Sequence, residues 1–192
     1  MKKAKTILGK VIIKRSYWLM TFAIACLALR GYSQYQPTKT TLTGEMADRI
    51  AIRELIDAYS HDADRREAEK QANLFTVDGV LYNYEGEPGK VKPESELRGR
   101  AALKAGFDFL KKFDVTMHFN GQSDIFLSGD SATGETYCLA HQFWMENGKR
   151  VLLVIGLRYY DKFVKVEGKW LFAERKLIYD WKDKRPSESG TF

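Results

Sequence analysis

Residues 132–166, ATGETYCLAHQFWMENGKRVLLVIGLRYYDKFVKV, decide the fold class. The segments on both sides of Asn147-Gly148 are rich in β-branched and aromatic residues, which is typical of β-strands. Asn-Gly between two such segments is a strong signal for a two-residue hairpin turn. The stretch therefore predicts two long antiparallel strands over residues 132–145 and 150–166.

The strand pattern continues on both sides of this hairpin. Downstream, residues 167–168 predict a second turn and residues 169–181 a further strand. Upstream, residues 115–120 and 123–127 predict two more strands, with residues 129–130 as the turn that leads into the long pair. Together these segments predict an antiparallel meander in the C-terminal half of the chain.

The region before the meander has a helical period instead. Apolar residues and alanines recur at helical spacing over residues 46–59. Residues 65–75 and 100–112 predict a second and a third helix, with a short strand at residues 80–84 and a Pro- and Gly-containing loop at 85–97. Helices followed by a long antiparallel meander predict an α+β domain.

The charge of the chain is unevenly distributed. The formal net charge is +6, but residues 1–33 hold seven Lys and Arg residues and no acid. Subtracting these seven leaves −1 for residues 34–192. Nucleic-acid binding needs a basic face in the folded part, so we expect no nucleic-acid partner.

The basic N-terminus is typical of a secretory signal peptide. The fourteen apolar-rich residues 16–29 suit its hydrophobic region and are short for a membrane span. Gly31 and Ser33 favour cleavage before Gln34. Cleavage there predicts a periplasmic or secreted protein without a stable membrane span. The alternatives are an uncleaved N-terminal anchor and a lipoprotein processed at Cys26. The chain is thus divided into signal peptide, polar tether, folded domain and C-terminal tail: residues 1–33, 34–42, 43–182 and 183–192.

Strand alternation divides residues 132–145 into two faces. One face carries Tyr137, Leu139, His141, Phe143 and Met145, and the other carries Cys138, Ala140, Gln142 and Trp144. An imidazole among apolar groups is a candidate acid or base, because its pKa lies near physiological pH. His141 is therefore a candidate acid or base.

His118 is a second candidate, on a strand face with Thr116 and Asn120. A catalytic imidazole needs a partner that fixes its tautomer. Asp62 and Asp64, near the end of the first predicted helix, are the candidate carboxylates. The alternative is a structural, hydrogen-bonded histidine beside ordinary solvated helix-end charges.

A metal site built from His61, Asp62, His118 and His141 is a third interpretation. His61 and Asp62 are adjacent in the chain, so they diverge on a helix. The sequence contains no pair of histidines at ligand spacing. The pattern therefore predicts no metal.

Four stretches resemble the motifs of one family. They are DRIAIRELIDAYSHDADRREAEKQANLFTVDGVLYNYEG (48–86), LRGRAALKAGF (97–107), HFNGQSDIFLSGDSATGETY (118–137) and RYYDKFVKVEGKWLFAERKL (158–177). The first has a helix that ends in Tyr, an Asp five residues on, then Leu-Phe and a further Asp: Tyr59, Asp64, Leu74, Phe75 and Asp78. In this order and spacing the chain is similar to SnoaL-like domains of the NTF2-like superfamily, over about residues 45–182.

The resemblance implies an NTF2-like cone, with three N-terminal helices packed on a strongly curved antiparallel sheet that encloses a mostly apolar pocket. Members of the superfamily include scytalone dehydratase, polyketide cyclases, a dehydrochlorinase and ketosteroid isomerases. Related cones commonly pair through the outer face of the sheet. The resemblance therefore implies a homodimer, and we expect its interface on the face with Cys138, Ala140, Gln142 and Trp144.

The resemblance also implies roles for individual residues. In the dehydratase and the dehydrochlorinase a pocket His paired with an Asp acts as a base, and the matching residues are His118 and Asp64. His141 matches the second pocket histidine of the dehydratase. The chain departs from the dehydratase at Ala63, where that enzyme has Tyr, and at Gly156, where it has a pocket Asn.

Two functions follow from this pattern. In the first, a cofactor-independent lyase or isomerase uses His118, Asp64 and His141 on a small cyclic or aromatic substrate. The substrate-binding candidates are Tyr59, Tyr82, Tyr84, Tyr137 and Phe143. In the second, the same pocket belongs to a non-catalytic ligand-binding or dimerisation module, since a fold does not fix a function. Both imply a small apolar or aromatic ligand and no cofactor.

Overall fold

The computed structural model describes residues 44–188. The predicted signal peptide and tether, and the last four residues of the predicted tail, lie outside the described residues. The elements, in chain order, are α2 (Gly44–Arg65), α3 (Ala68–Asn73), β1 (Phe75–Tyr84), β2 (Ser95–Arg98), α4 (Gly99–Phe107), the 3₁₀ helix η1 (Asp108–Lys112), β3 (Val115–Ser128), β4 (Ser131–Glu146), β5 (Lys149–Val166) and β6 (Lys169–Pro186).

The six strands form one sheet in the order β2-β1-β6-β5-β4-β3. Strands β3 to β6 are the predicted antiparallel meander, and the α+β fold class is confirmed. The expectation of an all-antiparallel sheet is wrong, because β1 pairs with β6 in parallel. Parallel neighbours need a long crossover, and the chain between β1 and β6 supplies one. The sheet is therefore mixed and open, with β2 and β3 at its edges.

Strand β3 joins two predicted strands into one. A register shift between Asn120 and Ser123 marks an irregularity at the point where the two predicted segments meet. A bulge of this kind changes which residues face the core. Upstream, His118 and Asn120 hydrogen-bond to α2, whereas downstream Ile125 and Leu127 pack against the core. The irregularity explains why one alternating pattern could not be followed through the segment.

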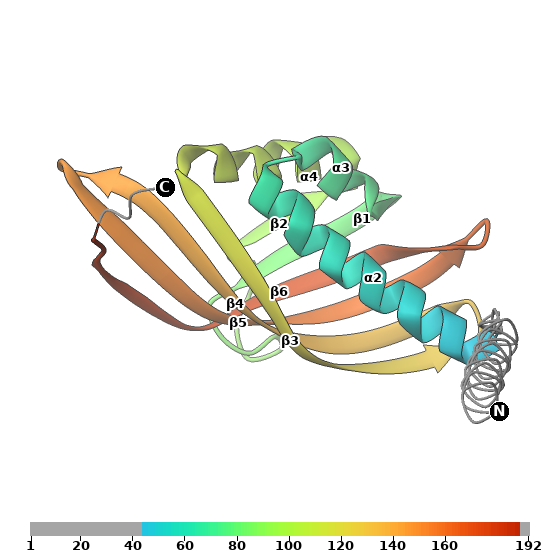
Figure 1. Cartoon of the computed structure of the whole chain (residues 1–192). Helices are drawn as coiled ribbons and strands as arrows, with labels where there is room; N and C mark the ends of the chain where they lie inside the picture. Colours follow the sequence, from blue (N-terminus) through green and yellow to red (C-terminus); the bar gives the residue numbers. More distant parts are fainter. Residues whose placement is uncertain (1–43, 189–192) are drawn as a thin grey trace, which may run out of the picture. The chain divides into compact units, whose positions relative to one another are not determined.

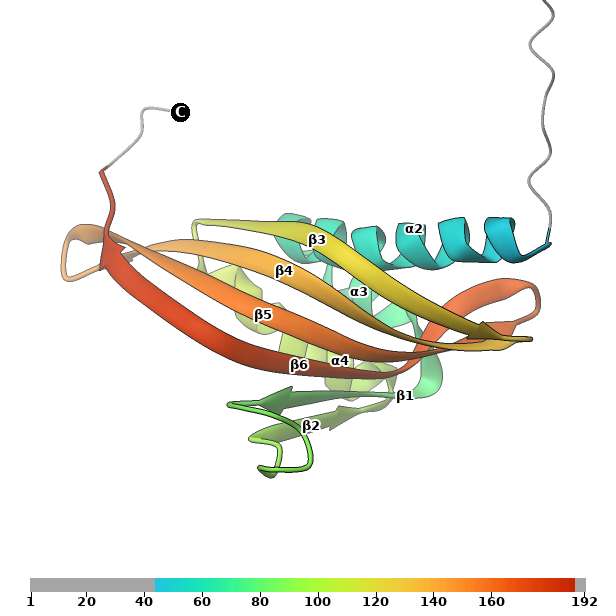
Figure 2. The same cartoon turned by 90° about the horizontal axis from the view of Figure 1, so that it is seen from below.

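The helices lie on one side of the sheet (Figure 1). Figure 2 shows α2 along the β3 edge, with α3 and α4 behind the strands. The expectation that all three helices are N-terminal to the sheet is not met, because α4 follows β1 and β2 in the chain. Strand β2 begins at the end of the segment predicted to be a loop, residues 85–97, and pairs with β1.

One stripe of α2 is hydrogen-bonded to β3 along its length, and we call these contacts the α2–β3 seam. Arg49 and Arg53 donate to the backbone carbonyls of Ile125 and Gly121, at 2.7 and 2.9 Å. These bonds satisfy acceptors at the sheet edge, where an unpaired strand is a liability. The other side-chain contacts of the seam are Arg53–Ser123, Asp64–His118, and those of Asn120 with Asp57, Ser60 and the Ile56 carbonyl.

A buried ion pair lies in the core between β5 and β6. Arg175 is 0% exposed, and its Nε and Nη2 atoms donate to the two carboxylate oxygens of Asp161, each at 2.8 Å. The guanidinium also lies 4.0 to 4.3 Å from the ring centroids of Tyr59, Tyr159 and Phe172. Burying a charge is costly unless it is paired. The ion pair therefore holds the surrounding aromatic rings in one arrangement.

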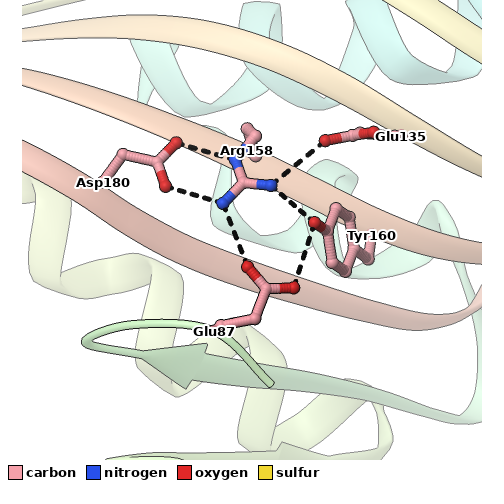
Figure 3. Close-up of polar contacts among 5 residues, drawn as sticks. All are labelled: Glu87, Glu135, Arg158, Tyr160 and Asp180. Carbon is pink, nitrogen blue, oxygen red and sulfur yellow. Dashed lines mark hydrogen bonds and ion pairs between the residues drawn. The ribbon is translucent and has the colours of Figure 1, made fainter. Parts of the chain in front are cut away.

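A second arginine organises the opposite face of the sheet. Arg158 binds both carboxylate oxygens of Asp180 at 2.8 Å and contacts Glu135, Tyr160 and Glu87 (Figure 3). Glu87 lies between β1 and β2, and it also accepts a hydrogen bond from the Tyr160 hydroxyl at 3.2 Å. These contacts fasten the segment between β1 and β2 to the sheet.

Replacing Arg175 with Met is expected to lower the free energy of unfolding by about 3–5 kcal/mol, because the Asp161 carboxylate is left buried without its partner. The double variant Arg175→Met/Asp161→Leu should recover much of this loss, since it removes both charges. Urea unfolding measures both effects. Lys162→Met is the control: Lys162 is exposed in its ion pair with Glu174, so its loss should change stability by less than about 1 kcal/mol. A double variant no more stable than Arg175→Met would contradict the assignment.

Candidate functional site

A cavity of about 480 Å³ lies between the sheet and the helices, which both contribute to its lining. Strand alternation sets its sheet wall, where Ala140 and Gln142 of β4 and Ile155, Leu157 and Tyr159 of β5 face inward. Residues of α2 and α4 supply the opposite wall. Most of the lining is aliphatic or aromatic, which suits a small apolar ligand.

Asp64 and His118 meet at the wall of this cavity. Asp64 Oδ1 lies 2.7 Å from His118 Nδ1, and Asp64 Oδ2 accepts a hydrogen bond of 2.9 Å from the His118 backbone N–H. The His118 side chain is 8% exposed and lines the cavity. Fifty-four residues separate the two in sequence, so only the packing of α2 on β3 brings them together.

The two contacts of Asp64 fix the orientation of the imidazole. One carboxylate oxygen holds the backbone at His118 and the other holds the ring. A carboxylate on Nδ1 favours the tautomer in which Nδ1 carries the proton. Within residues 44–188, Nε2 of His118 has no hydrogen-bond partner. The arrangement therefore leaves Nε2 free to accept a proton.

Several polar side chains line the same cavity. Tyr59 and Tyr159 are buried, and burial raises the pKa of both hydroxyls, so both stay protonated near neutral pH. Gln142 and Tyr179 are also in the lining. Among the predicted substrate-binding residues, only Tyr59 lies here. Gln142 lies here too, although we assigned it to the outer face.

His141, Tyr137 and Phe143 lie on the opposite face of β4, outside the cavity. The prediction that they line it is wrong in its choice of face. Alternation separates the two sets of side chains but does not say which set points inward. The core identifies the inward face, because Cys138 and Ala140 belong to it: Cys138 is 3% and Ala140 1% exposed. The dimer interface was expected on the face with Cys138, Ala140, Gln142 and Trp144. That prediction is also wrong, because this face points inward.

Tyr82 and Tyr84 are also outside the cavity, because Leu81 and Asn83 are the residues of β1 that line it. The Tyr82 hydroxyl accepts a hydrogen bond from Arg98 at 3.1 Å. Gly156 likewise faces away from the cavity. A Cβ atom at Gly156 would lie 2.1 Å from the Trp181 indole nitrogen, so a larger side chain there would require the half-exposed Trp181 side chain to move.

The residues of the alternative metal site do not converge. The His61 side chain is exposed on α2, His118 lines the cavity, and His141 is on the far face of β4. Residues 44–188 contain no group of three or more His, Cys, Asp or Glu side chains placed to hold a metal ion. In the same residues, no helix is long and apolar enough to cross a membrane.

Comparison with known proteins agrees with the fold. The model of the SnoaL-like domain family matches residues 44–176. An uncharacterized protein of Mycobacterium tuberculosis strain H37Rv is 26% identical over 136 residues, which cover 68% of this chain and 84% of the relative. That relative is similar in sequence and brings no assigned reaction with it.

Solved structures resemble the described domain. One is a Novosphingobium aromaticivorans protein assigned as a scytalone dehydratase, with 25% identity, a TM-score of 0.61 and coverage of 72% of this chain and 87% of that one. Another is the hexachlorocyclohexane dehydrochlorinase LinA, with 18% identity, a TM-score of 0.61 and coverage of 77% and 93%. At 18% identity the second likeness concerns the fold alone.

Proposed function

The chain belongs to the SnoaL-like domain family, and from this premise we propose that it is a cofactor-free lyase or isomerase in which His118 is the base. The observation that carries the proposal is the contact of 2.7 Å between Asp64 and His118 at the cavity wall. The similarity to a protein assigned as a scytalone dehydratase supports the same class of reaction.

In the proposed reaction, Nε2 of His118 removes a proton from a carbon next to a carbonyl or a leaving group. The electron pair of the broken C–H bond then forms a new double bond. In an elimination the leaving group departs with its electrons, and in an isomerisation His118 returns the proton to another carbon. Asp64 stabilises the imidazolium ion, which is the role of a carboxylate behind a catalytic histidine.

The cavity also offers donors for the oxygen on which charge develops. The hydroxyls of Tyr59 and Tyr159 keep their protons because burial raises the pKa of each, and the amide of Gln142 is a third donor. Donors held in place in a site with little water stabilise such charge strongly. We propose that these groups, rather than His141 or Tyr137, polarise the substrate.

A non-catalytic ligand-binding module is the second candidate. It is favoured by one observation: the predicted catalytic residue His141 and the predicted substrate-binding residues Tyr82, Tyr84 and Tyr137 are outside the cavity. In such a module, His118 would be a hydrogen-bonded part of the wall. The two candidates differ in whether the protein transfers protons.

Exchange of a substrate C–H for deuterium in D₂O detects proton removal without knowledge of the final product. We expect the protein to catalyse this exchange in at least one member of a panel of small cyclic ketones and β-substituted ketones, followed by NMR. His118→Ala should reduce the exchange rate by about 10²–10⁴-fold in a protein that is still folded, which circular dichroism checks. Asp64→Asn should also slow exchange, since the imidazolium loses its carboxylate.

His61→Ala is the matched control, because His61 is an exposed histidine on the same helix as Asp64. It should keep the full exchange rate. A panel that binds but never exchanges would favour the binding module. A His118→Ala protein that unfolds easily yet still exchanges would mark His118 as structural.

We further propose a homodimer formed through the outer face of β3 and β4. Met117 and Phe119 of β3 are 58% and 69% exposed, and Tyr137 and Leu139 of β4 are 43% and 40% exposed. Phe119 and Leu139 are direct cross-strand partners. An exposed apolar patch of this kind is typical of an interaction site. Pairing two copies would cover it.

The Phe119→Lys variant should sediment as a monomer at concentrations at which the native protein sediments as a dimer, because a charge would be placed inside the interface. Val77→Lys is the control: Val77 is equally apolar and 76% exposed, but lies on β1 away from the patch. A native protein that is monomeric at micromolar concentration would contradict the proposal.

Export is also a proposal, supported by the basic and apolar N-terminus. N-terminal sequencing of protein from the producing cells should find Gln34 as the first residue, in the periplasm or the medium. A lipidated Cys26, or membrane-bound protein that retains Met1, would show that one of the alternatives holds.

A further inference from the structure

A second hollow adjoins the cavity that contains His118. It has a volume of about 640 Å³, and four residues line both spaces: Phe109, Gln142, Ile155 and Tyr179. We call the cavity with His118 the inner chamber and the second hollow the outer chamber. The shared residues place the two chambers next to each other.

The outer chamber is lined by charged residues, unlike the inner one. It carries Lys112, Lys182 and Lys184 together with Glu85 and Glu146. Lys184 Nζ lies 2.8 and 2.9 Å from the two carboxylate oxygens of Glu146. Lys182 forms a close ion pair with Glu85. Two of the three lysines are therefore neutralised within the chamber.

Lys112 carries the remaining charge. Within residues 44–188 it has no carboxylate partner. Its ammonium group lies 3.5 Å from the ring centroid of Phe109 and 4.9 Å from that of Phe113. A cation over an aromatic face is held by the quadrupole of the ring. The outer chamber thus has one net positive charge, positioned beside aromatic walls.

We propose that the outer chamber binds the carboxylate of an elongated aromatic or cyclic acid whose ring system lies in the inner chamber. The proposal defines the substrate class of the proposed function and uses the same site. One unpaired ammonium matches a singly charged carboxylate, whereas a phosphate dianion would bring two charges to one cation. Phe113 and Trp144 line the outer chamber and can contact the planar part of the molecule next to its carboxylate.

The test compares biphenyl-4-carboxylate with its methyl ester, which has the same rings but no charge. Isothermal titration at low ionic strength should show that the native protein binds the acid about fivefold more tightly than the ester, the size of effect typical of an exposed charge pair. Added salt should weaken binding of the acid and leave binding of the ester almost unchanged.

Lys112→Met should remove the preference for the acid and keep the affinity for the ester, which shows that the chamber is still intact. Lys111→Met is the matched control, because the Lys111 ammonium lies 2.6 Å from the Asp108 carboxylate and lines neither chamber. It should keep the preference. Equal binding of acid and ester by the native protein, no measurable binding of the acid, or a preference that survives Lys112→Met would overturn the proposal.

This binding test is independent of the test for catalysis. His118→Ala keeps Lys112 in place, so it should retain the preference for the acid while it loses deuterium exchange. A native protein that prefers the acid but exchanges nothing would contradict the role of His118 as a base and leave the anion site standing. Deuterium exchange without any preference for the acid would contradict the anion site and leave the role of His118 as a base standing.

Discussion

The α2–β3 seam is the constraint on which the site depends. Its helix residues recur every three or four positions and therefore lie on one stripe of α2: Arg49, Arg53, Asp57, Ser60 and Asp64. Each contributes a polar contact to β3, one of the two edge strands of the sheet. The seam fixes the distance between helix and sheet, and so one wall of the inner chamber. Its last contact is Asp64–His118, which means that the candidate catalytic pair is part of the same set of bonds that positions α2.

The deep wall of the inner chamber rests on a second interaction. Tyr59 and Tyr159 face the chamber, and the guanidinium of Arg175 lies against both rings from behind. Arg175 is held by Asp161 on the neighbouring strand. The tyrosines are thus fixed by packing in a low-dielectric region, in which an oriented hydroxyl interacts more strongly with charge than it would in water. The buried ion pair that stabilises the core therefore also positions the two tyrosines that we propose to polarise the substrate.

The sequence predicts the strands of the meander and the identity of the His–Asp pair better than it predicts the lining of the cavity. Asn147-Gly148 and the β-branched and aromatic segments on both sides of it are local signals, so the β4–β5 hairpin could be predicted from them. Asp64 and His118 could be matched only through the family resemblance. The inward face of β4 depends on which side the helices cover, which alternation does not encode. Small residues at Cys138 and Ala140 are the signal that would have identified it.

The parallel pairing of β1 with β6 and the joined strand β3 escaped prediction for similar reasons. Both depend on contacts between distant segments: Tyr82 pairs with Lys176, and the irregularity in β3 lies opposite residues of β4. The outer chamber could not be predicted either, because Lys112 is one of several lysines in its segment. Only the structure shows that Lys111 is paired with Asp108 while Lys112 lies over Phe109.

The central claim is that Asp64 holds the His118 ring with its proton on Nδ1, so that Nε2 carries no proton and can act as the base. The ¹⁵N NMR spectrum of the labelled His118 ring tests this most directly, at a pH at which the ring is neutral. The account predicts a protonated Nδ1 and an Nε2 with the shift of a nitrogen that carries no proton, and it predicts that Asp64→Ala removes this tautomer preference. A proton on Nε2 in the native protein would contradict the account, because that nitrogen could not then act as the base.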